Sequence, residues 1–107
     1  MSYGEIVRVR APIETYRAMH HQIGELLGTD VPAGAILHVA RETDDGFEVI
    51  EVWDSKANAD AFKRETLTLA IEKLGTDAAG PPPQFESFAP TTAITFGSYS
   101  TDSSGRR

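Results

Sequence analysis

Residues 46–74 change abruptly from the alternation of a strand to the spacing of a helix. Two sets of side chains alternate through the strand: Phe47, Val49, Glu51 and Trp53 on one face, and Glu48, Ile50, Val52 and Asp54 on the other. Asp54 and Ser55 are residue types that cap helix N-termini, and the alanines and Phe62 that follow favour a helix. The segment therefore predicts a strand that leads directly into a helix.

The apolar stripe of this second helix shifts its phase near the middle. Phe62 leads by helical steps to Thr66 and Leu69, whereas the later apolar stripe consists of Leu67, Ala70, Ile71 and Leu74. A straight α-helix cannot bury both stripes on one face. We therefore expect a kink or a short break between Arg64 and Leu67.

The N-terminal part of the chain shows the same two periods. Alternating residues predict a first strand over residues 3–10, which Pro12 ends. Apolar residues at helical spacing predict a helix over residues 13–27, and Gly28 suits its C-terminal cap.

Two more strands complete the pattern. Residues 35–41 alternate as a second strand, and Asp44-Asp45-Gly46 predicts a hairpin turn, with Asp45-Gly46 as the favoured pair. The second and third strands should then be antiparallel neighbours. Residues 84–97 predict a last strand, which Pro90 interrupts in the manner of an edge strand or a bulge.

The resulting order β-α-β-β-α-β is that of the ferredoxin-like α+β fold, in which a four-stranded antiparallel sheet carries two helices on one face. We expect one domain over residues 1–97 and a flexible polar tail over residues 98–107. The other face of the sheet has no helix to cover it. An uncovered apolar face predicts a homodimer in which two copies pair sheet to sheet.

Composition excludes several classes of function. The net charge of −6, with no basic block before Arg106-Arg107, argues against binding to nucleic acid or to an anionic membrane. The absence of cysteine excludes disulfides, thiolate metal sites and cysteine catalysis. The sequence has no apolar run of membrane-spanning or signal-peptide length, which predicts a cytoplasmic protein. It also contains neither a nucleophile elbow nor a glycine-rich phosphate loop, and it implies no cofactor.

The strand residues sort into an aliphatic and a mixed set. The aliphatic set is Val7, Val9, Leu37, Val39, Ile50 and Val52, and the mixed set is Ile6, Arg8, Ile36, His38, Val49, Glu51 and Trp53. A dry interface between two sheets favours the aliphatic set, because unpaired buried charges are costly. The mixed set would then face the helices, where His20 and Phe62 also point, and could line a small-molecule pocket. The reverse assignment stays open, because helices also need an aliphatic surface to pack on.

His38 is the candidate for acid–base chemistry. It lies on the same face as Glu51 of the paired strand, and a carboxylate beside an imidazole can make a general base or simply hold a buried histidine. Arg8 could bind an anionic group of a substrate or form an ion pair with Glu51. A metal site built from His20, His38 and Glu51 has no support in the spacing of these residues, so we expect no metal.

The other candidates would line the pocket. His20 lies on the apolar face of the first helix, where it could contact a ligand or be a core histidine with a local hydrogen bond. Trp53 and Phe62 could form an aromatic platform for a ligand, although aromatic residues at such positions more often belong to the core.

The chain resembles the dimeric α+β barrel superfamily and, within it, the antibiotic-biosynthesis-monooxygenase-like domains. The resemblance rests on GFEVIEVWDSKANADAF at residues 46–62, HVA at residues 38–40 and the proline-containing stretch before the last strand. It covers residues 3–96 and implies a homodimer whose two sheets form a barrel, with a cavity between sheet and helices in each subunit. Haem-degrading relatives carry a histidine in the second half of the last helix, and residues 66–74 contain none.

Three functions follow as alternatives. The first is a small dimeric α+β barrel protein that binds a small apolar or aromatic molecule between sheet and helices. The second is a cofactor-independent monooxygenase or an isomerase/cyclase in which His38 is the acid–base residue. The third is a purely structural or sensory dimer whose polar groups satisfy one another.

Overall fold

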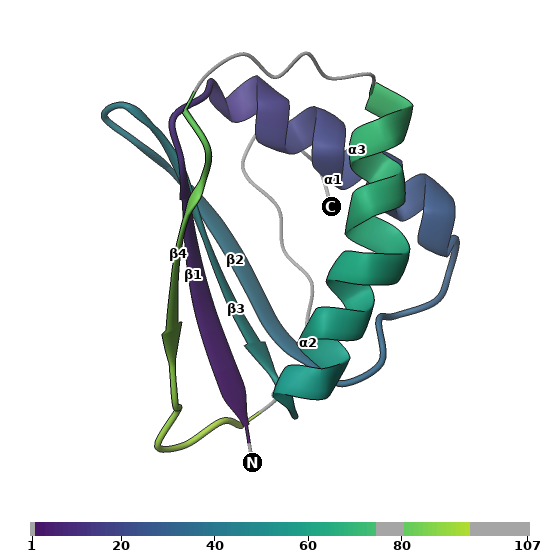
Figure 1. The fold of residues 1–107 in the computed structure, drawn as a ribbon, viewed down its shortest axis with the longest axis vertical. Helices are drawn as coiled ribbons and strands as arrows, with labels where there is room; N and C mark the ends of the chain where they lie inside the picture. The colour runs from purple at the N-terminus through teal and green to yellow at the C-terminus, as the bar shows by residue number, and fades with distance from the viewer. Residues whose placement is uncertain (1, 75–80, 95–107) are drawn as a thin grey trace.

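A computed structural model describes residues 2–74 and 81–94 and shows an α+β fold with helices on one side of a four-stranded antiparallel sheet (Figure 1). The elements in chain order are β1 (Tyr3–Val9), α1 (Ile13–Leu27), β2 (Ala35–Thr43), β3 (Gly46–Trp53), α2 (Lys56–Phe62), the π-helix η1 (Lys63–Leu67), α3 (Thr68–Leu74) and β4 (Gln84–Phe88). The strand order in the sheet is β2-β3-β1-β4, so the predicted ferredoxin-like arrangement is confirmed.

The two ends of α1 and the start of α2 lie where their residue types predict. Helix α1 follows Pro12, and at its other end the N–H of Gly28, at a φ of 64°, donates to the carbonyl of Gly24 at 2.9 Å. Ser55 caps α2, because its hydroxyl oxygen accepts a hydrogen bond from the backbone N–H of Asn58 at 3.2 Å.

The expected break in the last helix is confirmed as a π-helical turn, η1, between α2 and α3. The wider turn accommodates one extra residue, so it brings Leu67 back toward the face that Phe62 occupies. The hydroxyl of Thr68 donates to the carbonyl of Lys63 at 2.9 Å and satisfies an acceptor within the widened turn.

The β2–β3 hairpin turns within the predicted segment Asp44-Asp45-Gly46, but not on its favoured pair Asp45-Gly46. Thr43 pairs with Gly46, so Asp44 and Asp45 form the two-residue loop and Gly46 is the first residue of β3. Strand β2 accordingly runs two residues beyond its predicted end at Arg41. Gly46 is needed for another reason: a Cβ atom there would clash with the carbonyl oxygen of Val9 at the end of β1.

The last strand is shorter than predicted. Strand β4 ends at Phe88, and residues 89–94 form no strand, because Pro90 has no N–H to donate to a ladder. Residues 95–97, the remainder of the predicted strand, and the predicted tail over residues 98–107 lie outside the described residues.

The register of β1 corrects the predicted sorting of the sheet faces. Val7 lies opposite Val49, and Val9 opposite Phe47, so both valines face the helices and not the open face. Ile6 and Arg8 are on the open face, opposite Ile50 and Glu48. Alternation within β1 defines two faces but cannot say which one the helices cover.

The predicted assignment of β2 and β3 side chains to the two sheet faces is confirmed for the residue pairs that the register gives. His38 pairs with Glu51 on the helix side, while Leu37 pairs with Val52, and Val39 with Ile50, on the open side. A register irregularity lies between Ala35 and Leu37. The buried apolar residues are Phe47, Val49, Val52, Trp53, Ala59 and Ala70.

Within residues 2–74 and 81–94, no helix has the length and apolar character that crossing a bilayer requires.

Candidate functional site

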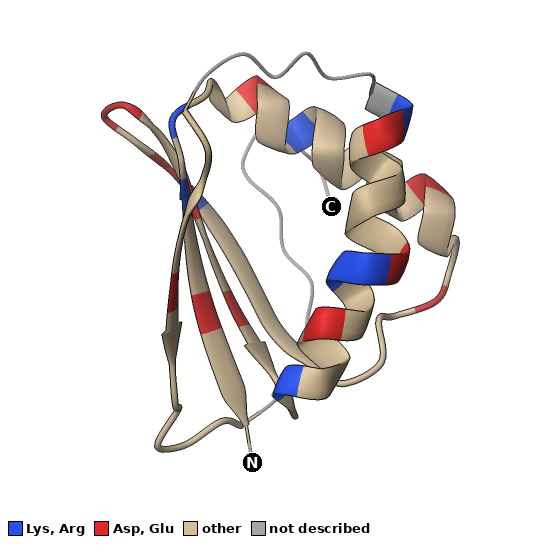
Figure 2. Cartoon of the chain, in the orientation of Figure 1, with Lys and Arg blue, Asp and Glu red and all other residues tan. Residues whose placement is uncertain are grey.

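A row of polar residues crosses the helix-facing side of the sheet. One residue comes from each strand in the order β2-β3-β1-β4: His38, Glu51, Glu5 and Ser87. Apolar rows flank it, with Val7, Val49 and Phe85 on one side and Tyr3 and Trp53 on the other. We call these four residues the polar row. Figure 2 shows acidic segments side by side on neighbouring strands, beneath the helices.

The β2 end of the polar row forms a hydrogen-bonded chain. His38 Nδ1 lies 2.9 Å from Glu51 Oε2, and His38 Nε2 lies 2.7 Å from the hydroxyl of Tyr16 on α1. A carboxylate accepts only, so a neutral His38 carries its proton on Nδ1, and Nε2 accepts from the Tyr16 hydroxyl. Trp53 Nε1 donates to Glu51 Oε1 at 3.3 Å. The structure therefore places Tyr16, His38, Glu51 and Trp53 in one connected chain.

Aromatic rings surround this chain. The Tyr16 ring stacks on His38 with a centroid separation of 5.9 Å, and it also contacts His20 at 5.5 Å and Phe47 at 5.7 Å. Trp53 contacts Phe62 at 5.3 Å on the other side of the chain. The sequence-predicted residues His20, His38, Glu51, Trp53 and Phe62 all lie on this helix-facing side.

His20 is a neutral neighbour of the chain near neutral pH. Its ring centroid lies 5.8 Å from that of His38. Partial burial lowers the pKa of His20 from its ordinary value, and the charge that His38 can carry lowers it further. His20 can therefore offer one donor and one acceptor while His38 is engaged on both nitrogens.

The β1 part of the polar row is a buried ion pair. The Glu5 side chain is 5% exposed, and its Oε2 accepts from Lys63 Nζ at 2.6 Å and from the Tyr3 hydroxyl at 3.2 Å. Burial and the adjacent Glu5 raise the pKa of Tyr3. Lys63 lies on η1, and its ammonium group is 5.2 Å from the centre of the Phe85 ring. The other oxygen of Glu5, Oε1, is buried and has no hydrogen-bond partner within residues 2–74 and 81–94.

Arg8 is absent from this arrangement, and its predicted place beside His38 is wrong. Its side chain extends from the open face, where it contacts Glu48 at 3.1 Å and Glu86 at 3.0 Å. Arg41 binds the second oxygen of Glu48 at 2.8 Å. Arg41 first, and Arg8 after it, keep the pKa of Glu48 below its ordinary value. The ion pair that the sequence allowed between Arg8 and Glu51 does not form.

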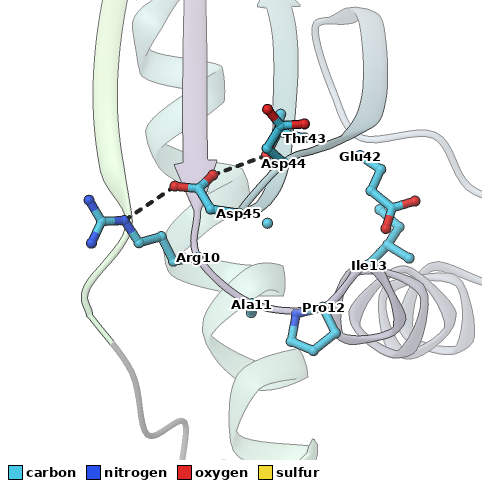
Figure 3. A pocket seen from close by; sticks show the side chains of 9 residues that line it. Arg10, Ala11, Pro12, Ile13, Glu42, Thr43, Asp44 and Asp45 are labelled. Atoms are coloured by element: carbon cyan, nitrogen blue, oxygen red, sulfur yellow. Dashed lines mark hydrogen bonds and ion pairs between the residues drawn. The ribbon is translucent and has the colours of Figure 1, made fainter.

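Two pockets of the described residues lie at the other end of the sheet. One, of about 390 Å³, is an open hollow between the β2–β3 hairpin and the segment that enters α1 (Figure 3). In it Arg10 forms an ion pair with Asp45 at 3.6 Å. The other, of about 480 Å³, is bounded by Arg8, Arg41 and residues 81–84. Neither includes His38.

Three residues of the site were missed by the sequence analysis: Tyr16, Glu5 and Lys63. Tyr16 precedes His20 by one helical turn, so the shared helical face was an available signal. Glu5 lies on the same face of β1 as Val7, and it was missed because that face was wrongly assigned to the open side of the sheet. The described residues contain no group of three or more histidine, aspartate or glutamate side chains able to hold a metal ion.

The sequence matches no protein-family profile and no curated protein. Solved structures do match. Rv0793 from Mycobacterium tuberculosis is 15% identical, with a TM-score of 0.63 over 89% of this chain and 100% of that one. A protein of Nitrosomonas europaea named "putative antibiotic biosynthesis monooxygenase" is 16% identical, with a TM-score of 0.65 over 84% and 90%.

A third similar structure, from Chloroflexus aurantiacus and named in the same way, is 22% identical, with a TM-score of 0.62 over 91% of this chain and 100% of that one. At these identities the likeness concerns the path of the backbone and not the side chains of the site. The chain therefore has the fold of the antibiotic-biosynthesis-monooxygenase-like domains.

Proposed function

We propose that this protein is a homodimer that binds a small apolar or aromatic molecule between sheet and helices, beside Tyr16, His38 and Glu51. The observation that carries the proposal is the hydrogen-bonded chain itself, which is flanked by aromatic rings and partly open to solvent. The His38 side chain is 40% exposed and the Glu51 side chain 16%, so a ligand can reach the chain. A few oriented polar groups among aromatic side chains are typical of small-molecule sites.

The open face of the sheet supports the dimer. Leu37 and Val39 are 46% and 43% exposed there, next to Ile6, Ile50 and Val52 on the same face. Large side chains of this kind, gathered on one face without a covering helix, are typical of protein interfaces. A second copy, which presents the same face, is the simplest partner.

The hydrogen bonds that link Tyr16, His38 and Glu51 also favour a second candidate function, a cofactor-independent enzyme in which His38 moves a proton. Glu51 holds the imidazole with Nε2 directed at the Tyr16 hydroxyl, so proton transfer from tyrosine to histidine needs no rearrangement of either side chain. A phenolate at Tyr16 could then take a proton from a bound ligand. This step is common to isomerases, to cyclases and to oxygenases that activate their substrate by deprotonation.

The fluorescence of Trp53 provides a test of binding, because Trp53 is the one tryptophan of the chain and donates to Glu51. Titration with 2-phenylethanol should change this fluorescence in a saturable way in the wild type. His38→Ala should abolish the change, whereas His21→Ala, on the exposed side of α1, should leave it intact. The absence of a saturable change in the wild type, for this and for other small aromatic alcohols, would favour a structural or sensory dimer.

A further inference from the structure

The geometry points to a site that selects ligands by charge: it accepts an uncharged or cationic molecule that donates a hydrogen bond, and it excludes carboxylates. Glu5 is the residue that sets this preference. The inference rests on the proposed function, because it names the class of ligand for the same site. It follows from the hydrogen bonds and the charges of the polar row.

The hydrogen-bond donors of Tyr16, His38 and Trp53 already have acceptors within the site. The Tyr16 hydroxyl is directed at His38 Nε2, the His38 Nδ1–H at Glu51, and the Trp53 N–H also at Glu51. This arrangement holds for neutral His38, whose single ring proton is on Nδ1. The ring of His20 adds one further donor and one acceptor.

Acceptor capacity remains on the two carboxylates. Each oxygen of Glu51 accepts one hydrogen bond, although a carboxylate offers about four lone-pair positions. Glu5, its direct neighbour across the sheet, has an oxygen with no partner among the described residues, but protein atoms cover it, so Glu5 acts on a ligand through its charge. A ligand that supplies a donor can use the spare acceptor positions of Glu51, and a ligand that supplies only acceptors cannot.

The charges of the row favour the same ligands. Glu5 and Glu51 lie opposite each other, and among the described residues only Lys63 binds either of them through an ammonium or guanidinium group. Arg8 and Arg41 are engaged with Glu48 on the other face of the sheet. With neutral histidines, the polar row and Lys63 together therefore have a net charge of −1, from two carboxylates and one ammonium group.

The cations of the helices do not change this balance. Arg17 pairs with Glu14 at 3.7 Å, and Arg64 pairs with Glu65 at 3.7 Å, and all four side chains are at least half exposed. Lys56 interacts electrostatically with Glu5, but Asp60 balances its charge at 2.8 Å. Exposed charges of this kind are screened by water and salt, whereas a carboxylate beneath the helices is screened much less. The field at the row is consequently dominated by Glu5, Glu51 and Lys63.

Three probes with the same phenylethyl body test the inference: 2-phenylethanol, 2-phenylethylammonium and 3-phenylpropanoate. Their affinities are measured by Trp53 fluorescence at low salt and checked by ligand-observed NMR. The alcohol and the amine should bind at least about tenfold more tightly than the carboxylate. Equal or tighter binding of the carboxylate would overturn the charge selectivity and leave the pocket itself in place. Failure of all three probes to bind would overturn the proposed function along with it.

Two variants identify the residue responsible. Glu5→Gln removes the buried charge at nearly constant volume and should narrow the ratio of amine to carboxylate affinity at least about threefold, while Lys63→Gln should widen it. Glu48→Gln removes a carboxylate from the open face and serves as the matched control, with an unchanged ratio. Circular dichroism establishes that each variant is folded. Because the readout is a ratio within one variant, a general loss of stability does not imitate it, and an unchanged ratio in folded Glu5→Gln would overturn the role of Glu5.

Discussion

The two faces of the sheet each carry one cluster of charged residues, but the clusters differ in how completely they are satisfied. On the open face, Glu48 has an arginine on each oxygen, from Arg8 and Arg41. On the helix face, Glu51 is bound by a histidine and an indole, and one oxygen of Glu5 has no partner in the part of the protein that the structure describes. A fully paired cluster fits a structural role, whereas spare acceptor capacity beside a titratable histidine fits a binding site.

The apolar residues divide between the faces in the opposite sense. Val49 and Phe47 are buried beneath the helices, whereas Leu37 and Val39 remain nearly half exposed on the open face. The helix face has therefore buried its apolar residues on β3 within one chain and left polar groups available, while Phe85 on the edge strand β4 stays 57% exposed. The open face has satisfied its charges and left apolar surface available, which suits a protein partner better than a small ligand.

The largest expected effect concerns the open face. Val39→Asp places an unpaired charge opposite Ile50 in the proposed interface and should convert a dimer into a monomer, because burying that charge is costly. A stable interface would bury roughly 800 Å² or more per partner, and sedimentation equilibrium measures the loss. Val52→Asp is a poorer test, because Val52 is buried already within one chain and its loss would also unfold it. A wild-type protein that sediments as a monomer at micromolar concentration would contradict the interface.

The next effect separates the two faces functionally. His38→Ala should lower the affinity for 2-phenylethanol more than about tenfold, since it removes the centre of the hydrogen-bonded chain. It should leave the dimer assembled, because His38 lies on the opposite face from Val39. Val39→Asp should show the reverse pattern. A fall in Tm without any change in affinity would show that His38 is structural.

A smaller effect should distinguish the two halves of the polar row. Tyr16→Phe removes the donor to His38 Nε2 and should cost about 1 kcal/mol in the free energy of unfolding. It should also shift the Nε2 resonance of His38 in nitrogen-15 NMR spectra. Tyr3→Phe removes a hydroxyl from the Glu5 half at 3.2 Å and should leave that resonance in place. Equal shifts in both variants would mean that the row responds as one unit.

The sequence predicted the architecture well because each element is specified locally. The alternation of β3, the cap at Ser55 and the phase slip before Leu67 each depend on neighbours in the chain, and the strand, the capped helix start and the π-helical turn are all present. The hairpin likewise aligned His38 with Glu51. These features involve short separations in sequence, where backbone geometry and residue type decide the outcome.

The errors arose where distant segments meet. Which face of β1 the helices cover depends on its pairing with β3, which is forty residues along the chain for the pair Arg8 and Glu48. That one choice moved Arg8 into the predicted site and left Glu5 out of it. Lys63 was missed for the same reason, because its partner Glu5 is 58 residues away in the sequence.

The smallest expected effect is a pH dependence that belongs to the helix face alone. The pKa of His20 is lowered from its ordinary value of 6.5, first by burial and then by the charge of His38. As the pH falls through 6.5, the unfolded chain therefore takes up a proton at this position before the folded chain does, and stability decreases. Well above 6.5 both states are neutral, and His20 contributes nothing to the pH dependence.

His20→Gln should consequently be less sensitive to acid than the wild type. Urea unfolding one pH unit above 6.5 and one unit below it measures the difference, and His21→Gln provides the reference for losing a histidine from the exposed side of α1. The ring contacts of His20 with Tyr16 and His38 are lost at both pH values, so only the change between them reports the titration. If the wild type and His20→Gln lost the same stability on acidification, the lowered pKa of His20 would not be the source of the pH dependence. If Val39→Asp altered the loss of stability between the two pH values, the two faces of the sheet would be energetically coupled, although their side chains extend from opposite sides of β2.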